Sequence, residues 1–489
     1  PVVPPVVAPN PHGLAPSWWT LDATPGRPRL LLASAVVGLL AALLVADHVP
    51  GFGYVLVLLA GGAVVWAATG WRRDPFTVAC GLLAAALVAV LMIRAAEWIG
   101  ILCALAATVL CLVGTTRART FAGIAFTGLL WPFTALHSLP WLGRTIRAMG
   151  GRGHGLSVAR TVALSLVGVV AFGLLFASAD ALFASWVGAI VPDLGDALLL
   201  FRIFVGVAVG GLVLATSYLA LNPPAVDGIT GSTPRPVQRR YEWLVPVLLV
   251  DLVFVAFLAA QATAFFGGHD FVRRTTGLTY ADYVHQGFGQ LTVATVLTLI
   301  VVSIGFRKAP RATTADRAWL RGSLGLLCAL TLVVVASALH RMDLYQEAYG
   351  FSRLRLLVDA FEIWLGLLVV AVVVAGIRLR GSWLPRLALL SGATVLLVLA
   401  VSNPDARIAQ HNVERWQETG KIDVAYLDGL SDDATPALLD LPRNLVSCLR
   451  LTSDATPFWD WNLGRQHARD ALAAAPVSTP PCAESGPRA

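Results

Sequence analysis

The segment 351–366, FSRLRLLVDAFEIWLG, carries ionisable side chains inside a long apolar stretch. Arg355, Asp359 and Glu362 are spaced at i, i+4 and i+7, so a helix places them on one face. At 1.5 Å per residue, Asp359 and Glu362 lie roughly 9 and 13 Å beyond Arg353 along that helix. Charged groups at this depth in a membrane face the protein interior and mark sites for ions, protons or polar solutes. The alternative is structural, with Arg355 pairing with Asp359 to join helices.

A second intramembrane acid is Asp251, near the middle of another apolar stretch. A lone carboxylate in lipid needs a partner, and Arg202, a few residues into a different apolar stretch, is one candidate. Whether such a pair would be structural or functional stays open. The candidate intramembrane polar site therefore comprises Asp251, Arg355, Asp359, Glu362 and Arg202.

Two loops rich in polar side chains are expected on the same side of the membrane, GLTYADYVHQGFGQL and HRMDLYQEAYGFSRLRL. Together with Asp359 and Glu362 they predict one polar cavity that opens to that side. A rim of solvated interfacial residues is the alternative. The candidate outer-cavity residues are Tyr280, Asp282, His285, Gln286, Gln290, Arg341, Glu347 and Arg353.

The elements that must position these groups are membrane-spanning helices. Of the 489 residues, 57% are hydrophobic and only 13% are charged, which excludes an ordinary soluble domain. Each crossing of about 30 Å of hydrocarbon needs roughly 20 apolar residues. Eleven stretches qualify, which predicts an all-α, polytopic transmembrane bundle over 30–402. The stretches are 30–47, 52–70, 76–93, 97–115, 158–178, 198–221, 242–265, 287–306, 318–340, 354–377 and 383–402.

The loops follow the positive-inside rule when the N-terminus is cytoplasmic. Arg and Lys gather in alternate loops, among them 116–157, 235–240 and 307–321, while acidic residues dominate the stretch 179–197. An odd number of spans then exports the C-terminus. The net charge of +7 is spread over these loops, so it indicates topology and no nucleic-acid partner. Residues 1–29 form a Pro-rich cytoplasmic tail, expected to be disordered, and the first span is expected to direct insertion.

The segment near 121–140 is apolar enough to be a twelfth span. Pro132 and Pro140 interrupt it, and arginines flank it on both sides with no acid between them. Because both flanks then prefer the cytoplasm, we expect a re-entrant or interfacial segment instead.

After the last span the composition becomes that of a soluble protein. Residues 403–475 have helical periodicity and predict a small extracytoplasmic helical domain, followed by a Pro-rich tail, 476–489, expected to be disordered. Cys448 and Cys482 both lie there, where oxidising conditions would permit a disulfide. The other four cysteines lie in apolar spans and are expected to be core residues.

Three functions remain open. No metal-ligand run, phosphate-binding glycine loop or nucleophile elbow is present, so no metal site and no cofactor is expected. The first hypothesis is a transporter or transport-accessory protein that binds an ion or polar solute. The second is a glycosyltransferase-like envelope enzyme acting on a lipid-linked or cell-surface substrate, with Asp47 and His48 in its first external loop. The third is a non-catalytic sensory or scaffold subunit with a membrane or envelope protein partner.

Several segments resemble a bacterial membrane family, the domain of unknown function four-one-seven-three, related to family four-one-five-three. The similar segments are LLFASADALFA, the 242–268 stretch ending in QATAFFGG, TYADYVHQGFGQL, EAYGFSRLRL and NPDARIAQHNVERWQETGKIDVAYLDGLSDDATPAL. Phe351 and Ser352 stand where that family is expected to have Leu and Thr. The resemblance covers roughly 160–470 and implies a plasma-membrane protein without an established activity.

Overall fold

The computed structural model is built from helices, and its described residues contain no strand. It describes 24–70, 74–149, 197–224, 226–228, 237, 239–276, 288–451 and 457–475, with scattered positions between 165 and 183. The predicted span 158–178 and the tails 1–23 and 476–489 lie wholly or mostly outside these residues. The all-α prediction is confirmed for the described chain.

Eight helices are long and apolar enough to cross a membrane, so the prediction of a multi-pass membrane protein is confirmed. They are α3 (Pro75–Ile93), α4 (Glu97–Thr116), α8 (Ala197–Leu221), α9 (Tyr241–Thr276), α11 (Phe288–Lys308), α12 (Thr314–Tyr349), α13 (Arg353–Arg378) and α14 (Leu384–Val401). Two further apolar helices, α1 (Pro28–Leu44) and α2 (Phe52–Ala68), have 17 residues each. The number eleven and the orientation stay predictions.

The segment 121–140 forms part of α5 (Phe121–Met149), which bends by 65° between Leu129 and Phe133. Pro132 lies at this break, as expected of a residue that cannot donate a helical hydrogen bond. A bent helix of this kind is either a broken span or a re-entrant segment, so the predicted re-entrant segment stays a prediction.

The chain divides into two compact units, which cut across the predicted boundary at residue 403. The first comprises 1–92, 107–230 and 456–461. In it α1 and α8 pack closely, and glycine at position 38 permits this approach. A Cβ atom on Gly38 would lie only 2.5 Å from the carbonyl oxygen of Gly206. It also contains the short helices η1 (Val226–Gly228) and η3 (Phe458–Asp460).

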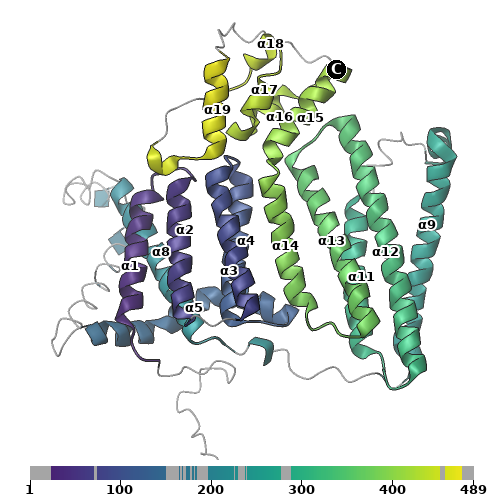
Figure 1. Ribbon diagram of the computed structural model, residues 1–489, viewed down its shortest axis with the longest axis horizontal. Coiled ribbons are helices and arrows are strands. Elements are labelled where there is room, and N and C mark those ends of the chain that lie inside the picture. The colour runs from purple at the N-terminus through teal and green to yellow at the C-terminus, as the bar shows by residue number, and fades with distance from the viewer. Residues whose placement is uncertain are drawn as a thin grey trace, which may run out of the picture. The chain divides into compact units, whose positions relative to one another are not determined.

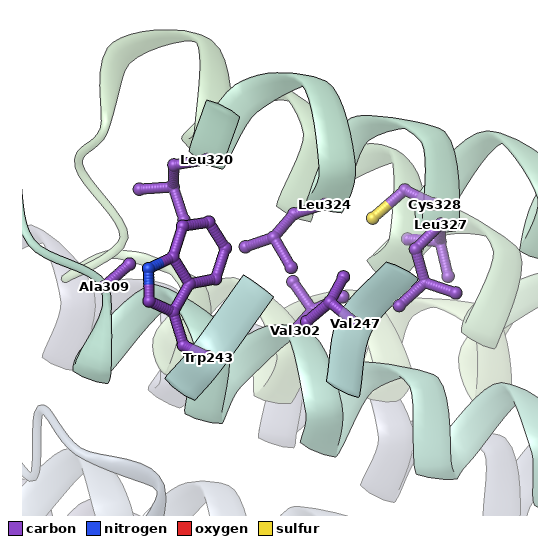
Figure 2. Close-up of a cluster of buried hydrophobic side chains, with 9 residues drawn as sticks. Trp243, Val247, Val302, Ala309, Leu320, Leu324, Leu327 and Cys328 are labelled. Carbon is purple, nitrogen blue, oxygen red and sulfur yellow. The ribbon is translucent and has the colours of Figure 1, made fainter. Parts of the chain in front are cut away.

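The second unit comprises 93–106, 231–455 and 462–489. In it α12 packs against α9, α11 and α13, and Figure 1 shows α12 between α9 and the other two helices. A buried cluster of Trp243, Val247, Val302, Leu324 and Cys328, with four further residues, fills the interface of α9, α11 and α12, as Figure 2 shows. Dispersion and close packing hold such an interface together in a membrane, where lipid is as apolar as the side chains.

The helices after the last span have their own core. They are α15 (Pro404–Thr419), α16 (Val424–Asp428), η2 (Asp432–Ala434), α17 (Thr435–Leu438), α18 (Arg443–Val446) and α19 (Leu463–Ala474). The core residues are Ala409, Val413, Leu427, Ala434, Leu438, Leu441, Val446 and Leu449. We call these helices the C-terminal helices; that they form an extracytoplasmic domain is a prediction.

Candidate functional site

Helix α13 carries the two acids that the sequence singled out. It begins after Gly350, whose φ of +82° ends α12, and Ser352 caps it by accepting a hydrogen bond from the Arg355 N–H. Asp359 and Glu362 follow within the first three turns, one turn apart on the same face. Glu362 is fully buried and Asp359 is half-buried.

Each carboxyl group has one neutral donor. The Gln346 side chain of α12 donates to Asp359 Oδ2 at 2.5 Å, and the Thr292 hydroxyl of α11 donates to Glu362 Oε1. The second oxygens, Asp359 Oδ1 and Glu362 Oε2, are buried and have no hydrogen-bond partner among the described residues. No ion pair of the described chain includes either group. The two carboxyl groups therefore sit together without a counter-charge.

The predicted alternative, an ion pair between Arg355 and Asp359, is wrong. Arg355 Nη1 donates backwards to the carbonyl oxygens of Tyr349, at 3.2 Å, and Gly350. Its guanidinium also lies 4.4 Å from the centre of the Tyr345 ring. The reason is that Arg355 stands in the first turn of α13, where the carbonyls ending α12 are closer than a side chain one turn deeper.

Arg202, the candidate partner of Asp251, has a different acidic partner. Arg202 binds Asp47 in the first unit, with 3.0 Å between Nη2 and Oδ2, because α8 packs beside α1 and Asp47 follows α1 directly. Asp251 lies in α9 with 3% of its surface exposed. Both of its carboxyl oxygens lack a hydrogen-bond partner in the part of the chain that the structure describes. It is a second buried acid without a cation.

The candidate outer-cavity residues are only partly described. Tyr280, Asp282, His285 and Gln286 lie outside the described residues. Gln290 and Glu347 are exposed and Arg341 is half-buried, while Arg353 reaches the C-terminal helices. Whether these side chains line one cavity stays a prediction.

Arg353 forms an ion pair with Asp405 of the C-terminal helices. Its Nε and Nη2 atoms donate to the two carboxylate oxygens of Asp405 at 3.0 and 2.6 Å. Asp405 is fully buried and also accepts from the Trp98 indole and the Ser431 N–H. Burial alone would raise the pKa of this carboxyl, but the bonds from Arg353 and Ser431 bring its pKa below the usual range.

The turn between α12 and α13 is held by α15 as well. Asn412 Nδ2 donates to the carbonyl of Phe351 at 3.0 Å, and Arg415 Nη2 donates to the carbonyl of Ala348 at 2.7 Å. The His411 ring stacks on Phe351 with centroids 4.4 Å apart. These contacts fix the turn that joins Gln346 to the helix of Asp359.

A second carboxylate attaches the C-terminal helices to the start of α4. Asp433 accepts from the N–H groups of Ala95 and Ala96, at 2.7 and 3.0 Å, just before α4 begins at Glu97. Burial raises the pKa of Asp433, although these two bonds oppose that rise. Sequence reasoning missed both Asp405 and Asp433; their position beside the helix starts Pro404 and Thr435 was the only local signal.

No group of three or more potential metal-ligating side chains occurs among the described residues. Cys80, Cys103, Cys111 and Cys328 are free thiols. Cys448 follows α18, and Cys482 lies outside the described residues, so their disulfide stays a prediction.

Comparison with known proteins identifies a family. No curated protein and no solved structure matches the chain. The family model described as a domain of unknown function, DUF4153, matches residues 82–441, which include α9, α11, α12 and α13 with all three buried acids. This match begins well before the region in which the sequence motifs pointed to a related family. The chain therefore belongs to the DUF4153 family of domains of unknown function.

Proposed function

We propose that this protein is a transporter or transport-accessory protein of the bacterial plasma membrane, and that Asp359 and Glu362 bind a proton or a small cation. The site would open to the extracytoplasmic side, beneath the C-terminal helices. The observation that carries the proposal is the pair of buried carboxyl groups whose only hydrogen-bond donors in the described chain are the neutral side chains of Gln346 and Thr292.

The energetic argument is direct. A charged side chain at the centre of a spanning helix costs about 2.5–3.5 kcal/mol on insertion scales. Two carboxylates one turn apart also repel each other, so at least one of them is favoured as the neutral acid or with a cation bound. A structural pair would be expected to include an arginine or lysine, as Asp405 does. The missing counter-charge supports a ligand that supplies it.

Charge at the helix ends supports the direction of opening. Arg239 and Arg240 precede α9, and the loop between α11 and α12 carries further Arg and Lys residues, as expected of cytoplasmic loops. The turn between α12 and α13 is at the other end of α12. Asp359 and Glu362 are close to that turn, so the shorter route to water is toward the predicted extracytoplasmic side.

The test is the thermal stability of the detergent-purified protein in panels of monovalent and divalent cations and of pH. It is run beside Asp359→Asn, Glu362→Gln and the matched control Glu347→Gln, whose side chain is exposed near the same end of α12. A cation or pH range that stabilises the wild type and the control but not the double variant supports the proposal. A double variant that is merely less stable, with no ligand-dependent shift in any protein, contradicts it and favours the scaffold function.

An envelope enzyme is the second candidate, and one contact favours it. His48 Nδ1 lies 2.8 Å from Asp460 Oδ1, and both side chains are largely buried. The two atoms do not meet the geometry of a hydrogen bond, but a carboxylate this close to an imidazole can orient it as a general base. Lipid-linked sugars are therefore included in the stability panel, where His48→Gln would remove a shift that depends on this pair and leave a shift at Asp359 and Glu362 intact.

A further inference from the structure

One face of α11 contains polar residues where an apolar core is expected. Its buried positions, Leu291, Thr295, Thr298 and Val302, repeat with heptad spacing and face α9 and α12. Thr295 and Thr298 are 1% and 2% exposed. Thr292, on an adjacent row, donates to Glu362. Three hydroxyl groups therefore follow one another down α11, starting at the proposed site.

The alignment of α9 with α12 shows which residue of α12 lies level with Asp251. Arg240, just before α9, bonds to Asp316 of α12 at 2.9 Å, and Gln261 accepts from Ser337 at 2.7 Å. The two helices therefore run parallel, and the position between these contacts brings Asp251 level with Cys328.

The alignment of α11 with α12 shows how far each threonine of α11 lies from Asp251 along the helix axis. Val302 shares a buried cluster with Leu324, and Leu291 packs with Val334 and Ala338, so these helices are antiparallel. Thr298 then lies level with Cys328, and so with Asp251, while Thr295 lies one turn nearer to Glu362. At 1.5 Å per residue, Thr292 and Thr298 are about 9 Å apart along the axis.

The hydroxyl groups are suited to pass a proton. Thr295 donates to the carbonyl of Leu291 at 3.0 Å, and Thr298 donates to that of Ala294 at 2.9 Å. Each hydroxyl oxygen keeps lone pairs that can accept another hydrogen bond. Neighbouring hydroxyls are three residues apart, about 4.5 Å along the axis, so a proton passes between them by way of a bridging water molecule.

Beyond Asp251 the polar column ends. Trp243, Val247, Val302, Leu320 and Leu324 close the interface toward the start of α9, as Figure 2 shows. No ion pair of the described residues includes Asp251, and neither of its carboxyl oxygens has a hydrogen-bond partner there. By the alignment above, Cys328 of α12 and Thr298 of α11 lie level with Asp251, and α13 contributes Val369 to the apolar cluster.

We propose that Asp251 is a second, deeper proton-binding site, which exchanges its proton with Glu362 through the hydroxyl groups of Thr292, Thr295 and Thr298 and water molecules that bridge them. This proposal rests on the proposed function and names its ligand as the proton. In the exchange the Glu362 carboxyl loses a proton and becomes a carboxylate, each hydroxyl and each bridging water accepts one proton and releases another, and the Asp251 carboxylate becomes the neutral acid. The apolar cluster beyond Asp251 prevents the proton from crossing while the bundle holds this conformation.

The test uses the full-length protein in lipid vesicles and infrared difference spectra recorded after a pH jump. A protonated buried carboxyl has a C=O stretching band, which Asp251→Asn should remove. In Thr298→Val and in Glu362→Gln the Asp251 band should persist but respond to the jump more slowly, by about tenfold or more. Thr394→Val is the matched control, because Thr394 of α14 makes the same bond to the carbonyl four residues earlier and is exposed.

Two results would overturn the proposal. One is a spectrum in which Asp251→Asn removes no pH-dependent band; the other is an Asp251 band that responds equally fast in Thr298→Val, Glu362→Gln and the control. Gel filtration identifies a variant that fails to fold, and Thr298→Val tests the route without altering a carboxyl. Failure of the proposed function is seen separately, because the bands of Asp359 and Glu362 would then be absent or independent of pH while Asp251 still titrated.

Discussion

The second unit contains two groups of acidic side chains that differ in their partners. Asp405 and Asp433, in the C-terminal helices, are buried, and each accepts several hydrogen bonds from protein groups. Asp251 and Glu362, in the membrane helices, are also buried and Asp359 is half-buried, yet none of the three accepts more than one hydrogen bond in the described chain. Asp433 also has one oxygen, Oδ1, without a partner among the described residues, so the two groups differ in the number of hydrogen-bond donors.

The difference separates structural from functional charge. A buried carboxylate that accepts several hydrogen bonds fixes one conformation, because losing its donors leaves a buried charge. A carboxyl with one donor or none can gain a proton or cation without first breaking several contacts. The comparison thus assigns the attachment of the C-terminal helices to Asp405 and Asp433, and ligand binding to the three acids of the spans.

The largest effect is expected from Arg353→Leu. The change leaves Asp405 buried without its cation, and we expect the attachment of the C-terminal helices to weaken by about 3 kcal/mol. Hydrogen exchange of α15 and α16 measures it. Arg450→Leu is the control, because Arg450 is 90% exposed in its ion pair with Asp428 and should contribute less than about 1 kcal/mol. Equal effects of the two changes would remove the distinction drawn above.

Low pH is expected to weaken the attachment of the C-terminal helices. The folded-state pKa of Asp405 lies below its ordinary value of 3.8, so its contribution is present above pH 3.8 and is lost as pH falls through the folded value. The pKa of Asp433 is raised, so its contribution has the opposite sign and is lost as pH rises through the folded value. We therefore expect Asp433→Asn to make the acid release steeper. Hydrogen exchange as a function of pH, with Asp405→Asn as the insensitive reference, tests this prediction.

A smaller loss is expected from Asp433→Ala, which removes the acceptor for the N–H groups of Ala95 and Ala96. By analogy with helix caps this costs about 1–2 kcal/mol. Asp433→Asn keeps an acceptor oxygen and should cost less. The exchange rates of the Ala95 and Ala96 amides report it directly, and unchanged rates in Asp433→Ala would contradict the role as a cap.

The smallest effect is expected from Arg355→Gln. Arg355 bonds only to carbonyl oxygens and stacks on Tyr345, so its loss should cost roughly 1 kcal/mol. Ligand-dependent stabilisation at Asp359 and Glu362 should remain, since neither acid depends on Arg355. A loss of that stabilisation would place Arg355 in the site and weaken the comparison.

The helices were largely predictable because hydropathy is a local property. The sequence predicted spans at 97–115 and 198–221, and the structure has helices Glu97–Thr116 and Ala197–Leu221. The burial of Glu362 and Asp251 was predictable for the same reason, since an acid inside a long apolar helix must face the protein interior.

The partners of those acids were not predictable, because they depend on how helices pack. Spacing along one helix suggested Arg355 for Asp359, but the bond comes from Gln346 across the α12–α13 turn. The donor to Glu362, Thr292, is 70 residues away in sequence, and nothing in the α11 segment distinguishes it from other threonines. These contacts depend on how neighbouring helices are aligned along their axes. That alignment cannot be deduced from a single sequence.

The attachment of 457–461 to the first unit has a consequence for biosynthesis. Phe52 donates its N–H to the carbonyl of Trp461 at 3.0 Å, and its ring lies 5.4 Å from that of Phe458. A ribosome that adds about 5–20 residues per second needs roughly 20 to 80 seconds to make the chain between these two segments. The start of α2 is therefore made long before residues 457–461, which contact it in the folded protein. Until those residues are synthesised, lipid or the insertion machinery must contact the start of α2 instead.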